Sequence, residues 1–156
     1  MISPFVYGET VHSSISDFLL LLKRDFGLFQ TPVLDSQGKK ARHCFYDLGS
    51  GLGKPCVTAA LTLPDYLTEC TGIELLEGLL GKSKELAVAY DQSEWAQERR
   101  AQNKNCPELS YIKDDFIVNN EDWVSNANVV FANATCFEPD MLETIAMLLR
   151  VRFAPG

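Results

Sequence analysis

Hydrophobic and polar positions follow one another along the chain in a pattern that predicts alternating helices and strands. Near the N-terminus, apolar residues recur at intervals of three and four, which is the spacing of one helix face. These residues are Ile15, Phe18, Leu19 and Leu22. A polar stretch with Pro and Gly at residues 31–40 then predicts a loop.

After this loop, four short apolar runs predict buried strands, and longer periodic stretches predict the helices that connect them. The predicted strands cover residues 43–48, 69–75, 109–113 and 128–133. The predicted helices cover residues 55–63, 76–102 and 141–153. Strands that alternate with helices in this way form parallel sheets with helices on both faces. We therefore expect an α/β fold with a doubly wound, mostly parallel sheet of the Rossmann-like kind.

Composition limits the class of protein further. The 156 residues, 46% apolar and 22% charged, suffice for one globular domain with a real core. The net charge of −7 gives no overall attraction to nucleic acid. No stretch is apolar for the length of a membrane span, and the first residues lack the pattern of a signal peptide. We expect no membrane association.

The cysteines argue against disulfide and metal chemistry. There are five of them, an odd number, and no two form a C-x-x-C pair. Only two histidines are present, so a histidine-rich metal site is not expected either. The chain is predicted to work without a metal in a reducing, intracellular compartment.

The clearest local motif is a glycine-rich turn, DLGSGLG, that follows the first predicted strand and precedes a helix. It contains Asp47, Gly49, Ser50, Gly51 and Gly53. Glycines at this place let the backbone turn tightly and let a ligand approach. The spacing is neither that of a dinucleotide loop nor that of a triphosphate-binding loop. Many such turns in α/β proteins bind nothing, so this motif alone does not settle a ligand.

Acidic residues follow the next two strands. Glu74 ends the second, where a carboxylate in a doubly wound sheet reaches ribose hydroxyls, and Asp115 and Phe116 follow the third, where they can bind and stack an adenine. Taken singly, Glu74 would be a surface residue and Asp115 a turn former. Together with the glycine turn they indicate a ligand with adenosine but no pyrophosphate, which favours S-adenosylmethionine.

These motifs resemble those of class I S-adenosylmethionine-dependent methyltransferases. SPFVYGET near the N-terminus and VVFANATCF at the fourth strand narrow the resemblance to the disruptor-of-telomeric-silencing family, histone lysine methyltransferases that lack a SET domain. The resemblance extends from about residue 3 to about residue 153. It implies S-adenosylmethionine as cofactor, S-adenosylhomocysteine as product, a protein lysine as substrate, in particular in a core histone or nucleosome, and a nuclear location.

The resemblance also implies roles for single residues. Tyr7 and Thr10 match positions that cover the methionine end of the cofactor, and the glycine turn from Asp47 to Gly53 matches the loop beneath its amino-acid portion. Glu74 matches the ribose-binding acid, and Asp115 with Phe116 the adenine-binding pair. The expected catalytic residues, Asn133 and Phe137, match the wall where the methyl group meets the lysine. Residues 1–41 would cover the cofactor site and residues 42–156 would form the core, together one domain.

Several features depart from the family pattern. Lys54 replaces a glutamine, Asn133 lacks the second, adjacent asparagine, and the basic flanks that hold nucleosomes are missing. A complete methyltransferase sheet would need about three more strands after the last predicted helix. Without the resemblance, Asn133 would be an ordinary strand end and Phe137 a core residue. Two other functions therefore stay open: methylation of a non-histone protein or small molecule, and a non-catalytic binding module.

Overall fold

The computed structural model of the chain describes residues 11–33 and 41–153, except the side chains of Cys136 and of residues 151–153. Tyr7 and Thr10, the predicted covering residues, lie outside this range. The helices are α1 (His12–Phe26), α2 (Lys54–Thr62), α3 (Glu77–Asp91), α4 (Glu94–Ala101), α5 (Glu121–Asn126), the short 3₁₀ helix η1 (Ala134–Cys136) and α6 (Pro139–Phe153). The strands are β1 (Cys44–Leu48), β2 (Glu69–Glu74), β3 (Glu108–Lys113) and β4 (Ala127–Ala132).

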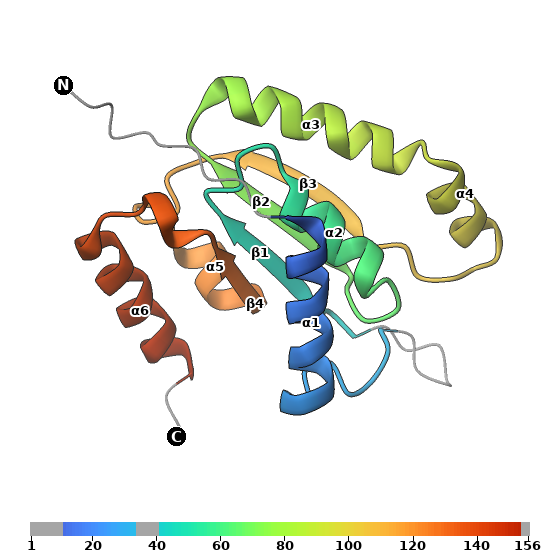
Figure 1. Cartoon of the computed structure of the whole chain (residues 1–156), viewed down its shortest axis with the longest axis horizontal. Coiled ribbons are helices and arrows are strands. Elements are labelled where there is room, and N and C mark those ends of the chain that lie inside the picture. Colours follow the sequence, from blue (N-terminus) through green and yellow to red (C-terminus); the bar gives the residue numbers. More distant parts are fainter. Residues whose placement is uncertain (1–10, 34–40, 154–156) are drawn as a thin grey trace.

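The four strands form one parallel sheet in the order β3-β2-β1-β4 (Figure 1). All five residues of β1 are buried, as expected for a central strand covered on both faces. Successive parallel strands need a helical crossover, which the helices between them provide. The predicted α/β fold with a doubly wound parallel sheet is thus confirmed.

Helices cover the sheet on two sides, because alternate strand residues point to opposite faces. On one face, α1, α2 and α3 bury Ile15, Cys56 and Leu80 against Phe45 of β1. On the other face, α5 and α6 pack around Tyr46 and Leu48 of β1; this second cluster also contains Trp123 and Ile145. As predicted, the apolar side of α6 faces inward: Met141, Leu148 and Leu149 pack against this cluster.

The predicted single helix over residues 76–102 is wrong, because the chain breaks into α3 and α4 at Gln92 and Ser93. Ser93 has an extended backbone, and its hydroxyl accepts a hydrogen bond from the Ala96 amide, which is the geometry of a helix N-cap. The same hydroxyl donates to the carbonyl of Tyr90 at 2.6 Å. The helix α5 and the 3₁₀ helix η1 also carry no periodic signal and were not predicted.

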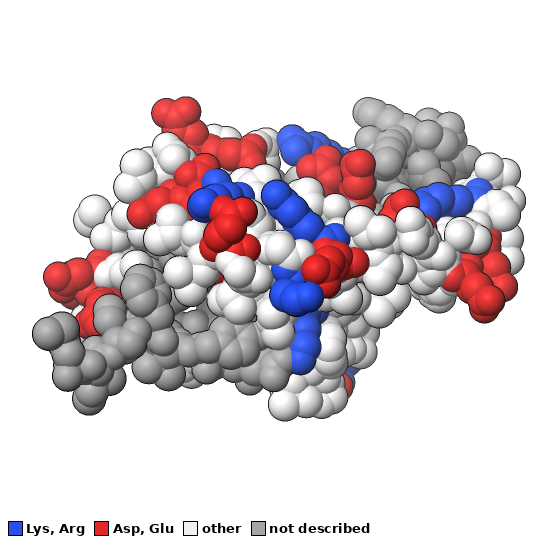
Figure 2. All heavy atoms as spheres, turned by 90° about the horizontal axis from the view of Figure 1, so that it is seen from above, with Lys and Arg blue, Asp and Glu red and all other residues white. Residues whose placement is uncertain are grey.

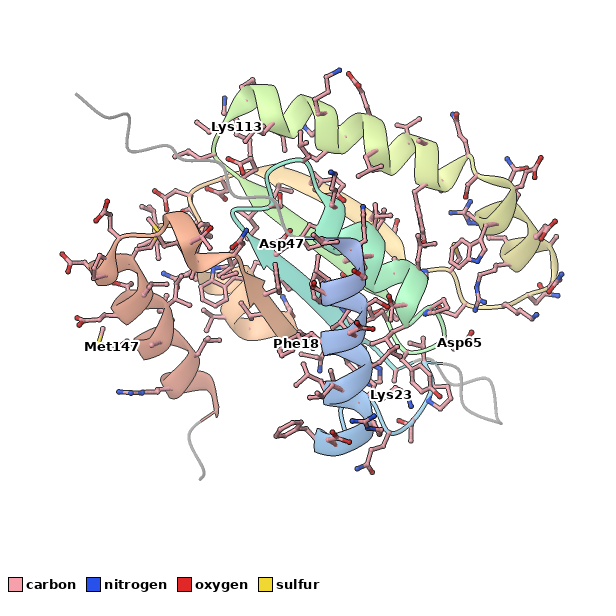
Figure 3. All side chains as sticks on the ribbon, viewed as in Figure 1. Phe18, Lys23, Asp47, Asp65, Lys113 and Met147 are labelled. Atoms are coloured by element: carbon pink, nitrogen blue, oxygen red, sulfur yellow. The ribbon has the colours of Figure 1, made fainter. Side chains whose placement is uncertain are left out.

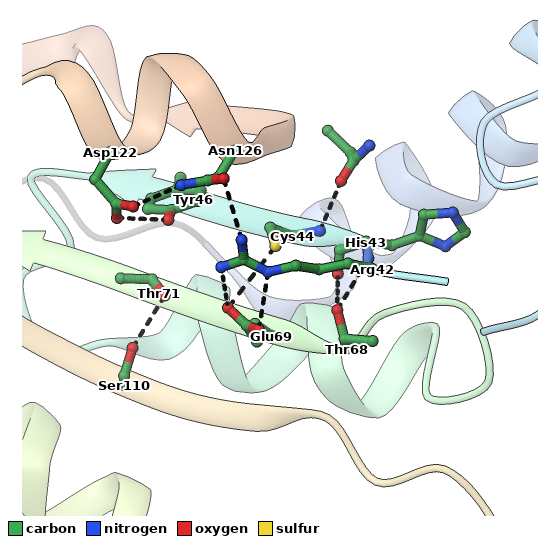
Figure 4. A network of polar contacts seen from close by, with 11 residues as sticks. Arg42, His43, Cys44, Tyr46, Thr68, Glu69, Thr71, Ser110, Asp122 and Asn126 are labelled. Atoms are coloured by element: carbon green, nitrogen blue, oxygen red, sulfur yellow. Dashed lines mark hydrogen bonds and ion pairs between the residues drawn. The ribbon is translucent and has the colours of Figure 1, made fainter. Parts of the chain in front are cut away.

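A polar network joins α5 to the sheet at the end where β2 begins (Figure 4). The Tyr46 hydroxyl donates to Asp122 at 2.7 Å. Arg42 donates to Glu69 at 3.0 Å and to Asn126 at 3.1 Å. Arg42 is exposed and Glu69 partly exposed, so their ion pair contributes little stability. The contacts that join α5 to the sheet are those of Asp122 and Asn126. The carboxyl ends of the strands lie at the opposite edge, which this network leaves clear.

Charges on the surface are mixed. Seen from above, a run of basic side chains crosses the middle of this face, with acidic side chains beside it (Figure 2). In the described part of the chain, no helix has the length and apolar character needed to cross a membrane.

Candidate functional site

The site is built where the parallel strands end, because their carboxyl ends share one edge of the sheet. After β1 the chain turns over the end of β2: the amides of Gly49 and Ser50 donate to the Ile73 carbonyl at 2.9 and 3.0 Å. The buried Glu74 carboxylate accepts from the Gly51 and Leu76 amides, both at 2.8 Å. The predicted glycine turn and the predicted ribose-binding acid are therefore in direct contact.

Glycine is required in this turn by its backbone angles. Gly49, Gly51 and Gly53 have φ values of +73°, +54° and +81°, a region that residues with a Cβ rarely adopt. At Gly49 there is a second reason, since an added Cβ would lie 3.1 Å from Cζ of Phe137.

Asp47 is the most unusual group of the site. It is only 1% exposed, and its Oδ2 has no hydrogen-bond partner among the described residues. Burial, and then the charge of Glu74, raises the pKa of Asp47 to about 8. A buried oxygen without a donor calls for an explanation. A polar ligand that brings its own donors supplies one, so the observation fits the cofactor that the sequence predicts. Figure 3 shows Asp47 in the interior, close to α2.

The side chain of Ser50 is buried beneath the glycine turn. Its Oγ is buried, has no partner among the described residues, and lies beneath the turn, where a Cβ added to Gly72 would be 2.7 Å away. Ser50 thus packs the turn onto β2.

The loop after β3 contributes Asp115 and Phe116. The Asp115 Oδ1 accepts from the amides of Ile117 and Val118 at 2.9 and 3.2 Å, so this carboxylate forms the local turn expected of an aspartate. Phe116 is buried, and Trp123 donates to its carbonyl at 2.8 Å. Asp115 thus has the contacts of a turn former, the alternative role expected from the sequence, and the predicted adenine-binding pair lies at the same edge of the sheet as Glu74.

The loop after β4 completes the arrangement. Phe137 is half-buried against Gly49, and its ring centroid lies 5.5 Å from that of Phe116. Asn133 is half-buried, and its Oδ1 accepts from the Thr135 hydroxyl at 3.1 Å. The structure thus brings the loops after all four strands to one edge. In the described part of the chain no group of acidic, histidine or cysteine side chains is arranged to hold a metal ion.

Sequence reasoning missed three residues of this region. Leu75, directly after Glu74, exposes 53% of its surface, so an apolar side chain lies next to the predicted ribose-binding acid. Gly72 lies inside β2, and a glycine within a strand does signal close approach of another group. That group is the ring of Tyr111 on β3. No motif in the sequence points to Tyr111.

Solved structures with a similar fold are methyltransferases. Magnesium protoporphyrin IX methyltransferase from Synechocystis PCC 6803 with bound SAH has a TM-score of 0.53, with 12% identity over 95% of this chain and 58% of that chain. The structure of the same enzyme with bound SAM has a TM-score of 0.53, with 13% identity over 96% of this chain and 62% of that chain. An arsenic(III) S-adenosylmethionine methyltransferase from Chlamydomonas reinhardtii has a TM-score of 0.50, with 17% identity over 78% and 36%.

At these identities the likeness establishes the fold, which is that of class I S-adenosylmethionine-dependent methyltransferases. The chain spans between 36% and 62% of the length of these three proteins. No curated protein sequence matches it. The family described as "Histone methylation protein DOT1" matches residues 1–152, nearly the whole chain. The chain therefore belongs to the DOT1 family of histone methylation proteins.

Proposed function

We propose that this protein transfers a methyl group from S-adenosylmethionine to a lysine side chain of a protein, with a core histone as the substrate that the family favours. The observation that carries the proposal is the contact between Phe137 and Gly49. It sets the loop after β4, which would receive the substrate, directly against the loop that would hold the cofactor. Methyl transfer requires this adjacency.

Each part of the cofactor has a proposed group of residues to hold it. Asp47 and the turn from Gly49 to Gly53 would hold its amino-acid portion, Glu74 its ribose, and Asp115 with Phe116 its adenine. Residues 1–41, with Tyr7 and Thr10, would cover it. When bound, S-adenosylmethionine supplies an activated methyl group on its sulfonium, so the protein needs no nucleophile of its own.

The task left to the protein is to present a neutral amine. A lysine ammonium has an ordinary pKa near 10.4, and an apolar channel that excludes water favours the neutral form. Phe137 is suited to line such a channel. The amide of Asn133 would orient the amine without retaining it as a cation, which a carboxylate at this place would do.

The proposal is tested with purified protein, labelled S-adenosylmethionine and core histones. Asn133→Ala should bind S-adenosylhomocysteine nearly as well as the wild type but transfer the label at least about tenfold more slowly, because only the reacting amine is affected. Gly51→Val should abolish cofactor binding, because a β-branched residue cannot adopt its backbone angles.

The matched control is Asn128→Ala, at the other end of β4. The Asn128 side chain accepts from the Cys44 amide at 2.8 Å, so its loss should lower stability and leave the transfer rate unchanged. No label on histones or on any protein of a cell extract would refute protein methylation. Unchanged transfer by Asn133→Ala would refute its role.

A small molecule or a non-histone protein is the second candidate substrate. The net charge of −7 favours it, because it weakens attraction to nucleosomal DNA. Two of the similar structures are named for an arsenic and a porphyrin substrate. Label recovered only in the low-mass fraction of an extract would support this alternative. A nuclear location follows only if the histone is the substrate.

A further inference from the structure

We propose that Tyr111 of β3 is a positioning residue that holds the glycine turn in the shape needed to bind S-adenosylmethionine. The inference rests on the cofactor named above but not on the identity of the methyl acceptor. Tyr111 lies below the turn, on the face of the sheet covered by α2, and does not belong to any of the loops that would touch the ligand.

The first step of the argument is a hydrogen bond. The Tyr111 hydroxyl donates to the carbonyl of Gly53 at 2.6 Å, and the ring is buried, with 5% of its surface exposed. Gly53 ends the turn and is the N-cap of α2, with φ at +81°. The bond therefore fixes the peptide at the place where the turn passes into the helix.

The second step is the space that the chain leaves for the ring. A Cβ added to Gly53 would lie 2.6 Å from the ring, and one added to Gly72 would lie 2.5 Å from its Cδ1. Real Cβ atoms do not approach other atoms so closely, so both positions need glycine. The same Cβ added to Gly72 would also lie 2.7 Å from the side chain of Ser50, which belongs to the turn. Tyr111 and the turn thus rest side by side on one point of β2.

The third step concerns the proton of the hydroxyl. Burial, followed by the neighbouring Cys56 and Asp47, raises the pKa of Tyr111 above its usual range. The hydroxyl therefore stays protonated and remains a donor over the whole range in which the protein is handled.

Tyr111→Phe removes the hydroxyl and keeps the ring. Its dissociation constant for S-adenosylhomocysteine, measured by calorimetry, should rise about three- to tenfold, because the Gly53 carbonyl loses its donor and the turn loosens. Hydrogen exchange should quicken in the peptide covering residues 49–56 and stay unchanged in one covering residues 127–132.

Tyr90→Phe is the matched control. The buried Tyr90 hydroxyl also donates to a backbone carbonyl, that of Pro107 at 3.0 Å, but at the far end of α3. Both variants should lower the melting temperature, and only Tyr111→Phe should weaken binding. Equal dissociation constants for Tyr111→Phe and the wild type, or equal weakening by Tyr90→Phe, would overturn the proposal.

A measurement on the unaltered sequence makes the test independent of how well the variant folds. In protein labelled with 3-fluorotyrosine, the fluorine signal of Tyr111, assigned by elimination, should shift when S-adenosylhomocysteine saturates the site, and that of Tyr90 should not. An unmoved Tyr111 signal would overturn the proposal. Binding without transfer to any protein would leave it intact and count against the proposed function instead.

Discussion

At the scale of single residues, the site depends on groups whose chemistry burial has changed. Asp47 is the clearest case, because its carboxyl lies in the interior beside Glu74 and keeps its proton up to about pH 8. In the unfolded chain the same carboxyl loses its proton above about pH 4. Between these limits the unfolded chain binds fewer protons than the folded one.

It follows that the contribution of Asp47 to stability is fully present below about pH 4 and is lost as the pH rises toward 8. Between pH 6 and pH 7.5, the free energy of unfolding of the wild type should fall by about 1–2 kcal/mol more than that of Asp47→Asn, whose side chain cannot ionise. Urea unfolding at the two pH values measures this difference.

Asp17→Asn provides the control, because Asp17 is an exposed carboxyl on α1. The free energy of unfolding of Asp17→Asn should change with pH as that of the wild type does. If Asp47→Asn has the same dependence as the wild type, Asp47 is ionised in the folded protein at neutral pH.

At the scale of elements, the break between α3 and α4 shows how one residue, Ser93, can end one helix and begin the next. Ser93→Ala removes both the acceptor for the Ala96 amide and the donor to the Tyr90 carbonyl. We expect a loss of about 1 kcal/mol in the free energy of unfolding, the usual effect of removing an N-cap. Ser13→Ala, at an exposed position in the first turn of α1, should change it by less than about 0.5 kcal/mol. Equal effects of the two changes would show that Ser93 does not cap α4.

The same break shows where sequence patterns stop being informative. The strands were predictable because their apolar runs end in turn residues, and the glycine turn because only glycine tolerates its angles. The periodic pattern of residues 76–102 continues through Gln92 and Ser93. It therefore did not reveal the hydrogen bonds of Ser93 that end one helix and begin the next. Helix α5 has six residues, too few for a period to show.

For the site, the sequence predicted the groups on the loops but not those beneath them. Asp47, Glu74 and Phe116 can be picked out in the sequence because they lie at the ends of apolar runs or just after them. Tyr111 is an ordinary apolar residue in the middle of a strand, and its meaning depends on the register that sets it opposite Gly72. Register comes from pairing between distant segments, which a local pattern does not contain.

At the scale of the whole molecule, the net charge of −7 governs encounters with a basic substrate. With a core histone as the proposed substrate, transfer to free histones should be faster than transfer to nucleosomes, because the negative charge of the chain attracts the histones and is repelled by DNA. Raising the salt from about 50 to about 300 mM should slow transfer to free histones, since at 0.1 M attraction between charges more than about 10 Å apart is already largely screened.

Initial rates on both substrates over a salt series measure this effect, and binding of S-adenosylhomocysteine serves as the salt-insensitive control. Faster transfer to nucleosomes at low salt would contradict the electrostatic argument and point to a dedicated docking surface.

The position of β4 at one border of the sheet affects how the protein behaves in concentrated solution. Among the described residues β4 has a strand neighbour, β1, on one side only, and its sequence ANVVFA carries no charge. In natural sheets, lysine, proline or a bulge in such an edge strand prevents it from pairing with a strand of another chain. This border carries neither lysine nor proline, and the irregularity in its pairing with β1 lies at the start of the strand, where Cys44 pairs with Ala127 and Phe45 with Val129. Solutions of the 156-residue chain are therefore expected to become turbid on concentration, and dilute stocks should stay clear longer.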